Sequence, residues 1–517
     1  MGGANMLSNE WKALQNGSDI RGVALEGVEG QAVNLTEDVA HTLGKAFVLW
    51  LSRKLQKNMS ELRIGVGMDS RLSGPKLKEA FISGITELGS QVFDCGLAST
   101  PAMFMTTVTK GYEYDGAVMI TASHLPFNRN GLKFFTKDGG LEKEDITNLL
   151  EIAQEGNFPE VSNPGKRTEV DFISVYAQGL VDKVRREVNH PTHPMEPLKG
   201  FKIVVDAGNG AGGFYVDKVL VPLGADVEGS QYLEPDGRFP NHVPNPEDKE
   251  AMEAIIKAVK DNKADFGIIF DADVDRAGAV DRNGNPINRN RLIALVSAIV
   301  LEKWPNTTIV TDSITSTGLK KFIEEDLGGI HHRFKRGYKN VINEAIRLNE
   351  IGQECHLAIE TSGHGALKEN YFLDDGAYLV TTILIKMARM KIESGESIER
   401  LIEDLEEPVE AREFRMNIKV DNFTEYGNAL LRDLEEYAQQ AEGWNIAPDN
   451  HEGIRVSFGK DDGDGWFLLR MSLHDPVMPL NIESDSAGGV KIIASKILPF
   501  LEKYEGLDVS PIKEFLG

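Results

Sequence analysis

Three aspartates stand at alternate positions in a short segment that follows an apolar run. The run is residues 266–270, and Asp271, Asp273 and Asp275 come directly after it. Carboxylate oxygens suit a hard cation such as Mg²⁺, which proteins often bind together with a phosphate. A calcium loop of the EF-hand type needs Gly at the sixth position, where this sequence has Arg276. Because a basic side chain stands beside the carboxylates, a metal site shared with a phosphate is favoured over a solvated acidic turn.

A second candidate segment, residues 121–133, is rich in hydroxyl, Asn and Gly residues. Ser123 is a candidate nucleophile in it, and His124 and Lys133 are candidates for proton transfer. No G-x-S-x-G nucleophile elbow surrounds this serine. Taken alone, the segment is therefore better explained as a polar turn in which Ser123 caps backbone N–H groups.

Two further polar segments suit the recognition of a sugar phosphate. Glu360, Ser362 and His364 can hydrogen-bond sugar hydroxyls, and buried polar groups of this kind discriminate between hydroxyl patterns. Arg470 can bind a phosphate through two N–H groups, with Ser472 and backbone amides completing the site. In isolation, the first segment also fits an ordinary turn at a strand end, and the second fits an edge-strand arginine whose head group lies in water.

These segments follow apolar runs, and helical periodicity follows several of the loops. The runs that we expect to be strands are residues 63–67, 116–120, 201–205, 266–270, 308–310 and 356–359. Alternation of strand, polar loop and helix is typical of α/β domains with mixed or parallel sheets. Ligands of such sheets collect at the carboxyl ends of the strands. Towards the C-terminus the pattern changes to that of a small antiparallel sheet with helices, an α+β arrangement.

The length of 517 residues predicts three or four domains at roughly 150 residues each. The Pro-rich residues 189–197 are interpreted as a linker, and further breaks are expected near residues 304–306 and 407–408. The predicted domains are α/β domain I with the Ser123 loop at 1–190, α/β domain II with the aspartate loop at 191–303, α/β domain III with the Glu360 loop at 304–409, and α+β domain IV with the Arg470 loop at 410–517.

Composition excludes several classes of partner. The 80 acidic and 56 basic groups give a net charge of −24, which disfavours nucleic acid and anionic membrane. Two cysteines, Cys95 and Cys355, make no disulfide framework, and we expect a reducing, cytoplasmic setting. No signal peptide or apolar run of about 20 residues is present. We interpret residues 1–5 as an added leader ahead of a native start at Met6.

Taken in order along one chain, the four polar segments resemble those of the α-D-phosphohexomutases, the phosphoglucomutase/phosphomannomutase superfamily. Shorter matches extend the resemblance over essentially the whole chain, at residues 18–22 (S-D-I-R-G), 67–74 (G-M-D-S-R-L-S-G), 100–101 (T-P), 235–240 (P-D-G-R-F-P) and 374–376 (D-D-G). The resemblance implies three related α/β domains and a smaller fourth domain around a central active-site cleft.

The resemblance also implies a reaction, in which phosphate moves between C1 and C6 of a hexose phosphate through a phosphoserine and a hexose 1,6-bisphosphate. It implies Mg²⁺ as cofactor, a hexose phosphate (glucose is favoured) as partner, and a monomer or homodimer. The implied site residues are the phosphoserine Ser123; the acid/base and supporting residues Lys133 and His124; the phosphate and active-site contacts Arg21 and Arg276; the Mg²⁺ ligands Asp271, Asp273 and Asp275 with the phosphate on Ser123; the sugar contacts Glu360, Ser362 and His364; and the phosphate contacts Arg470 and Ser472.

Two segments depart from the family pattern. Ala272 and Val274 stand where the family usually has Gly, and we expect metal binding to survive because the carboxylates remain. Leu473, His474 and Asp475 replace the usual G-T-E part of the phosphate loop, where His474 can restore a hydrogen-bond donor. This second change leaves open a synthase that releases glucose 1,6-bisphosphate, fed by a donor such as fructose 1,6-bisphosphate. A non-catalytic sugar-phosphate sensor on the same scaffold is an alternative of another class.

Overall fold

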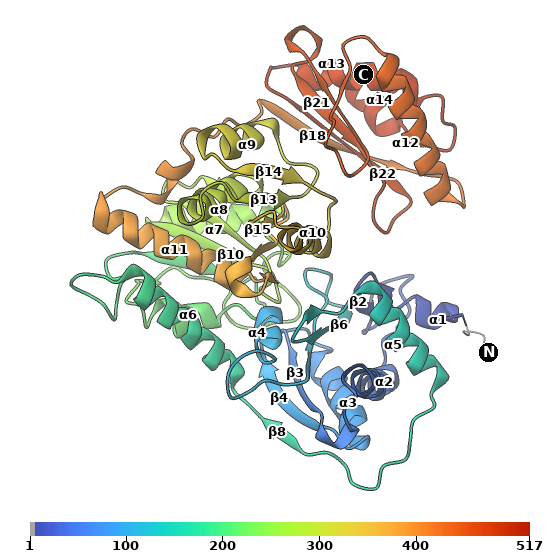
Figure 1. The fold of residues 1–517 in the computed structure, drawn as a ribbon, viewed down its shortest axis with the longest axis vertical. Coiled ribbons are helices and arrows are strands. Elements are labelled where there is room, and N and C mark those ends of the chain that lie inside the picture. The colour runs from blue at the N-terminus through green and yellow to red at the C-terminus, as the bar shows by residue number, and fades with distance from the viewer. Residues whose placement is uncertain (1–5) are drawn as a thin grey trace. The chain divides into compact units, whose positions relative to one another are not determined.

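The structure, a computed structural model, describes residues 6–517, which form four β-sheets with accompanying helices (Figure 1). The leader interpreted at residues 1–5 lies outside the described residues. The chain divides into two compact units. The first unit comprises the residues up to 288 together with 362–366 and 373–400, and the second comprises residues 289–361, 367–372 and 401–517.

The first sheet of the first unit is mixed. Its strands in spatial order are β1 (Gln15–Asn16), β2 (Asp19–Val23), β6 (Arg129–Thr136), β5 (Gly116–Ile120), β3 (Arg63–Met68), β4 (Gln91–Leu97) and β8 (Arg167–Glu169), and β7 (Gly139–Gly140) pairs with β6. Strands β5, β3, β4 and β8 run parallel, whereas β6 is antiparallel to β5 and β2. The carboxyl end of β5 therefore leads directly into the loop before β6.

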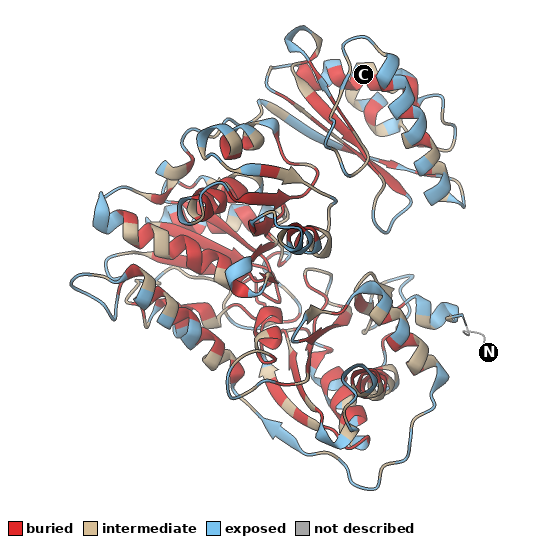
Figure 2. Ribbon diagram, in the orientation of Figure 1, coloured by how far each residue is buried: buried red, intermediate tan, exposed pale blue. Residues whose placement is uncertain are grey.

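Helices α2 (Glu37–Leu55), α3 (Gly74–Glu87) and α5 (Lys143–Glu155) cover the apolar core of this sheet. Two glycines allow α2 and α3 to approach closely. A Cβ at Gly44 would lie 2.3 Å from the Phe81 carbonyl oxygen, and one at Gly84 would lie 2.1 Å from that of His41. In Figure 2 the inward helix faces and the central strands are buried, which matches the amphipathic patterns in the sequence.

The second sheet of the first unit carries the aspartate loop. Its strand order is β12 (Pro286–Ile287), β11 (Ala277–Asp281), β10 (Phe266–Phe270) and β9 (Ile203–Asp206). Strand β9 is parallel to β10, and β10 is antiparallel to β11. Because Phe270 pairs with Ala277, residues 271–276 form the connecting loop at the end of β10. The helix α7 (Lys249–Asn262) packs its apolar face on this sheet.

The remaining strands form two five-stranded sheets. The third sheet has the order β14 (Ile330–Arg333), β13 (Thr308–Thr311), β15 (Cys355–Ile359), β16 (Gly365–Leu367) and β17 (Leu373–Asp374). The fourth, in the second unit, is antiparallel in the order β18 (Glu410–Asn417), β22 (Val477–Ser484), β21 (Gly465–Leu469), β20 (Ile454–Phe458) and β19 (Asn445–Ile446). Its core includes residues of α12 (Phe423–Gln440) and α13 (Gly489–Leu501).

The predicted fold class is confirmed: three α/β segments with mixed or parallel pairing precede a sheet-rich C-terminal segment. All six predicted strands are present within two residues of their expected ends. The domain boundaries and the central cleft stay predictions. Within residues 6–517, no helix combines the length and apolar character needed to cross a membrane.

Candidate active site

The three aspartates of the loop after β10 point their carboxylates at one another. Asp271, Asp273 and Asp275 are at most 2% exposed, and each offers an oxygen within 4.8 Å of the others. Val274, one of the departures from the family pattern, has φ of 65° and is fully buried. A β-branched residue is rare in this left-handed region, so the surrounding packing holds the loop in a strained conformation that a glycine would adopt without strain.

Ser123 lies against this loop. It follows β5, has φ of 52° and is 4% exposed. Its hydroxyl Oγ donates to Asp271 Oδ2 at 3.4 Å, and its backbone N–H donates to Thr121 Oγ1 at 2.9 Å. The serine proposed as nucleophile from the sequence therefore contacts the aspartate cluster proposed as a metal site, although 148 residues separate the two in the chain.

A buried ion pair supports the serine loop from behind. Arg71 donates to the carbonyl oxygen of Ser123, and its Nη1 donates to those of Pro126 and Arg129 at 3.0 and 3.1 Å. Its Nε lies 3.5 Å from Asp69 Oδ2. A planar guanidinium with several donors is suited to gather backbone carbonyls in this way. The left-handed conformation at Ser123 is thus held by bonds to its neighbours rather than by its own preference.

Lys133, on β6, reaches the same carboxylates. Its Nζ is 3.0 Å from Asp275 Oδ2 and 3.6 Å from Asp273 Oδ2, and its side chain is 6% exposed. Two carboxylates of the aspartate cluster therefore face the Lys133 ammonium group.

His124 occupies the other side of Ser123. Burial, followed by the charge of Arg276, lowers the pKa of His124 to about 3, so the imidazole is neutral near pH 7. Its Nδ1 accepts from Arg276 Nη2 at 2.7 Å and lies 3.4 Å from Ser123 Oγ. A proton-free Nδ1 held by an arginine suits a supporting residue better than a general acid.

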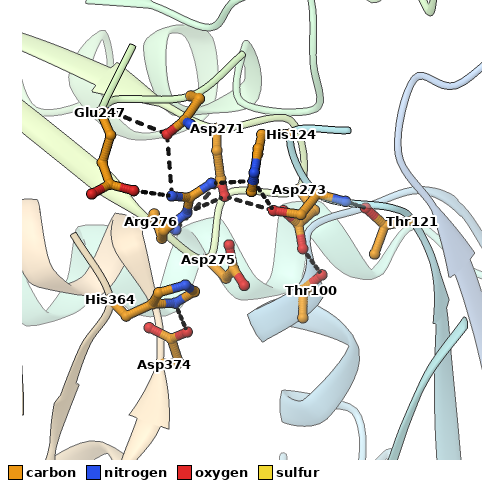
Figure 3. A network of polar contacts seen from close by, with 12 residues as sticks. Thr100, Thr121, His124, Glu247, Asp271, Asp273, Asp275, Arg276, His364 and Asp374 are labelled. Atoms are coloured by element: carbon orange, nitrogen blue, oxygen red, sulfur yellow. Dashed lines mark hydrogen bonds and ion pairs between the residues drawn. The ribbon is translucent and has the colours of Figure 1, made fainter. Parts of the chain in front are cut away.

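Arg276 links the aspartate loop to the segment just before α7 (Figure 3). Its Nε is 3.0 Å from Asp271 Oδ2, and its Nη1 donates to Asn245 Oδ1 at 3.1 Å and lies 3.5 Å from Glu247 Oε2. The side chain is 2% exposed. Although burial opposes it, these carboxylates raise the pKa of Arg276 above its ordinary value, so the guanidinium stays charged.

Arg21, on β2, lies in the same neighbourhood. Its Nη2 is 3.4 Å from Asp19 Oδ2, and its charge contributes to the lowered pKa values of His124 and Arg71. Its Nε is buried without a hydrogen-bond partner in residues 6–517. A partly unsatisfied guanidinium whose charge is felt by His124 is suited to an anionic ligand.

The aspartate cluster carries more negative charge than its protein partners satisfy. Burial, together with the neighbouring carboxylates, raises the pKa values of Asp271 and Asp273. Within the described chain, the Oδ1 atoms of Asp273 and Asp275 are buried and make no hydrogen bond. Unpaired carboxylate oxygens in a buried site are costly, and a divalent cation would satisfy them. The residues present therefore fit Mg²⁺, whose ligands are oxygens.

Of the expected sugar contacts, His364 joins this cluster. It forms an antiparallel bridge with Arg276, and its Nδ1 pairs with Asp374 Oδ2, as Figure 3 shows. Burial opposes protonation, but Asp374 and Asp275 outweigh it and raise the pKa of His364 above its usual range. Ser362 belongs to the same unit and is half-buried, whereas Glu360 belongs to the second unit, where its Oε1 accepts the Gly337 N–H at 2.7 Å.

The expected phosphate loop lies in the second unit. Arg470 follows β21 and is 5% exposed, and its Nε is 3.5 Å from Glu452 Oε1. Burial and the charge of Arg336 lower its pKa. The backbone N–H of Ser472 donates to the Val477 carbonyl oxygen at 2.9 Å, and Ser472 is half-buried, whereas His474 is exposed.

Family models of the phosphoglucomutase/phosphomannomutase α/β/α domains match three consecutive stretches of the chain. Domain I matches residues 12–159, domain II residues 174–284 and domain III residues 288–409. The chain belongs to the phosphoglucomutase/phosphomannomutase family. These matched stretches contain Ser123, the aspartate loop and His364.

Relatives of this phosphohexomutase family member span nearly the whole chain. A phosphomannomutase/phosphoglucomutase of Pseudomonas syringae pv. tomato is 32% identical over 90% of both chains, and a phosphoglucomutase of Neisseria meningitidis is 29% identical over 98% of this chain and 99% of its own. The crystal structure of a family protein from Burkholderia thailandensis has a TM-score of 0.76 at 27% identity and covers 96% of this chain and 98% of its own.

Several residues that hold the site of this phosphohexomutase family member escaped the sequence analysis. Thr100 Oγ1 donates to Asp273 Oδ2 at 2.5 Å, and Asp374 pairs with His364; both lie in short motifs that carried no assigned role. Asp69 and Arg71 lie in the 67–74 motif, which likewise had none. Glu452 had no signal at all, because a single acidic residue in an acidic chain is unremarkable until its partners are known.

Proposed function

We propose that this chain is an Mg²⁺-dependent phosphohexomutase that moves phosphate between C1 and C6 of a hexose phosphate. Ser123 carries the phosphoryl group, and a hexose 1,6-bisphosphate is the intermediate. The observation that carries the proposal is the contact between Ser123 Oγ and Asp271 Oδ2 at 3.4 Å, within a buried cluster of three carboxylates. A serine hydroxyl against a cluster that fits a divalent cation is the arrangement that phosphoryl transfer requires.

Asp271, Asp273 and Asp275 would hold Mg²⁺, which when bound offsets the charge of the transferring phosphoryl group. The protein supplies the rest of the charge balance. Arg276 stays charged between Asp271 and Glu247, and it holds His124 with its Nδ1 directed at the guanidinium. Both side chains are thereby fixed beside Ser123 before substrate arrives, which lowers the reorganisation that transfer would otherwise need.

Each phosphoryl transfer is accompanied by two proton movements, one at Ser123 Oγ and one at the sugar hydroxyl. When the phosphoryl group leaves Ser123, the P–Oγ bond breaks, a P–O bond to the sugar hydroxyl forms, and Oγ gains a proton while the hydroxyl loses one. We assign Oγ protonation to Lys133, whose ammonium group faces Asp275. His364, whose Nδ1 is engaged by Asp374, is assigned to the sugar as a contact, and the proton of the sugar hydroxyl passes to an oxygen of the transferring phosphoryl group. Glu360 and Ser362 are assigned to the sugar, and Arg470, Ser472 and His474 to the phosphate that does not react.

The changed phosphate loop favours a second candidate, a hexose 1,6-bisphosphate synthase. Leu473, His474 and Asp475 are exposed, and the loop lacks the Gly and Thr of the family pattern. A mutase must retain the bisphosphate while it turns round, so a weaker hold on the second phosphate would release it. The donor would then be a bisphosphate such as fructose 1,6-bisphosphate.

Phosphorus NMR distinguishes these functions. One sample contains protein, Mg²⁺, glucose 1-phosphate and trace glucose 1,6-bisphosphate; a second contains stoichiometric fructose 1,6-bisphosphate in place of the trace bisphosphate. Rapid glucose 6-phosphate in the first supports the mutase, and accumulating glucose 1,6-bisphosphate in the second supports the synthase. Ser123→Ala is the control, and unchanged turnover in that variant would refute the assignment of the phosphoserine. If the protein binds the hexose phosphate but neither turns it over nor carries phosphate on Ser123, the sensor is supported.

A further inference from the structure

Glu452 forms a bridge between two sheets of the second unit. Its Oε1 accepts from Ser313 Oγ at 2.8 Å, and its Oε2 accepts from the backbone N–H of Arg336 at 3.0 Å. Ser313 follows β13 and Arg336 follows β14, whereas Glu452 precedes β20 of the C-terminal sheet. The carboxylate is therefore held by the strand-end loops of the neighbouring sheet.

The same carboxylate faces Arg470. Glu452 Oε1 is 3.5 Å from Arg470 Nε, and the two side chains are 11% and 6% exposed. The register of β20 against β21 pairs Ile454 with Leu469, which brings Gly453 beside Arg470. A Cβ at Gly453 would lie 2.1 Å from the Leu469 carbonyl oxygen, so only glycine allows the chain to approach this closely and aim Glu452 at the guanidinium.

We propose that Glu452 is a positioning residue that orients Arg470 for phosphate, and that Ser313 and the Arg336 amide fix Glu452 in turn. The proposal rests on the proposed function in taking Arg470 as a phosphate contact. The Glu452 carboxylate attracts the guanidinium from its Nε side through the ion pair, and Arg470 Nη1 donates to the Met471 carbonyl oxygen at 3.3 Å. With the guanidinium held on these two sides, Nη2 is the group that would donate to an anion. The loop of Leu473, His474 and Asp475 lacks the Thr hydroxyl of the family pattern, so the orientation of Arg470 carries more of the binding.

Other contacts join the same segments without touching Arg470. Asp449 pairs with Lys320 at 3.5 Å, and Arg455 Nη1 donates to the carbonyl oxygens of Ser313 and Thr315 at 3.1 and 3.0 Å. These contacts align the two sheets. Asp449→Asn is therefore the control, because it removes an ion pair between the helix that follows Ser313 and the segment before β20 and leaves the bridge to Arg470 intact.

The test compares Glu452→Gln, Ser313→Ala and Asp449→Asn. With glucose 1-phosphate as substrate, we expect Glu452→Gln to raise KM about tenfold, equivalent to about 1.4 kcal/mol, with kcat within about threefold of the parent value. Ser313→Ala should raise KM by a smaller factor, and Asp449→Asn should leave it unchanged. Calorimetric titration with inorganic phosphate should show the same order of affinities.

A double mutant separates positioning from general damage. If Glu452 acts through Arg470, adding Glu452→Gln to Arg470→Lys should weaken phosphate binding no further than Arg470→Lys alone. Additive losses, an unchanged KM in Glu452→Gln, or an equal effect of Asp449→Asn would overturn the proposal. Tighter phosphate binding in Glu452→Gln would also overturn it, since Glu452 would then compete with the anion. If the parent protein turned over no hexose phosphate, the proposed function would fail, while the phosphate titrations would still decide the role of Glu452.

Discussion

The serine–aspartate cluster of the first unit and the arginine loop of the second unit are held in different ways. Ser123 and the three aspartates are buried and are cross-linked by Lys133, Arg276 and Arg71. The segment after Arg470 is exposed from Leu473 to Pro476. The difference indicates that the buried cluster is a rigid, desolvated setting of the kind that catalysis needs, whereas the exposed loop tolerates substitution with little structural consequence.

The largest effect is expected from breaking the buried cluster. Asp273→Asn removes a carboxylate whose Oδ1 has no hydrogen-bond partner in the described chain, and we expect kcat/KM to fall about 10³-fold. Calorimetric titration with Mn²⁺ should show loss of tight binding independently of activity. The exposed Asp261→Asn, on α7, is the control. Full metal affinity in Asp273→Asn would show that this aspartate is not a ligand.

The second prediction breaks the support of the serine loop. Arg71→Met leaves Asp69 buried without its partner, which should lower the free energy of unfolding by about 3–5 kcal/mol. Since the Ser123 carbonyl loses its donor, kcat should fall about 100-fold. Chemical denaturation and a coupled isomerase assay measure the two effects. Arg53→Met, at the exposed end of α2, is the control and should change neither quantity. A normal kcat in folded Arg71→Met would mean that the serine loop keeps its conformation without the Arg71 hydrogen bonds.

The third prediction sharpens the comparison by changing the exposed loop. The double substitution Leu473→Gly and His474→Thr restores the family residue types, and we expect it to raise the ratio of isomerisation to bisphosphate release about tenfold, near 1.4 kcal/mol. The free energy of unfolding should change by less than about 0.5 kcal/mol, as for other exposed positions. Phosphorus NMR of the products measures the ratio. An unchanged ratio would show that these two residues do not determine whether the bisphosphate is retained.

The smallest effect concerns a buried pair outside the reacting groups. His242 Nε2 is 2.9 Å from Asp206 Oδ1, and its side chain is 1% exposed. Burial opposes protonation, but Asp206 outweighs it and raises the pKa of His242 above 6.5. The stabilisation is therefore complete below about pH 6.5 and is lost as pH rises through the folded-state pKa.

His242→Gln tests this pair. The stability difference from the parent protein should be largest at pH 5.5, at about 1 kcal/mol, and should shrink by pH 8.5. Urea denaturation across this range measures it, with His193→Gln in the exposed segment 191–196 as control. A difference that grows with pH would contradict protonation of His242 in the folded state.

Local patterns predicted much of the fold. The buried runs that became β5 and β10 are short and apolar, and a run of this kind followed by a polar loop forms a strand in almost any α/β context. The predicted Ser123 and Asp271 loops adjoin these strands. The positive φ values at Ser123 and Val274 were not predictable, because neither residue type favours that conformation and only the surrounding bonds and packing impose it.

The sequence by itself determined which residue types are available: a serine, three aspartates and several arginines at strand ends, in an order that matches one family. The tertiary structure decided which of them meet. It joined Ser123 to Asp271, separated by 148 residues, and Glu452 to Ser313, separated by 139. Chain periodicity reports only neighbours within a turn or a strand, whereas these contacts depend on how sheets and loops pack, which is a property of the whole fold.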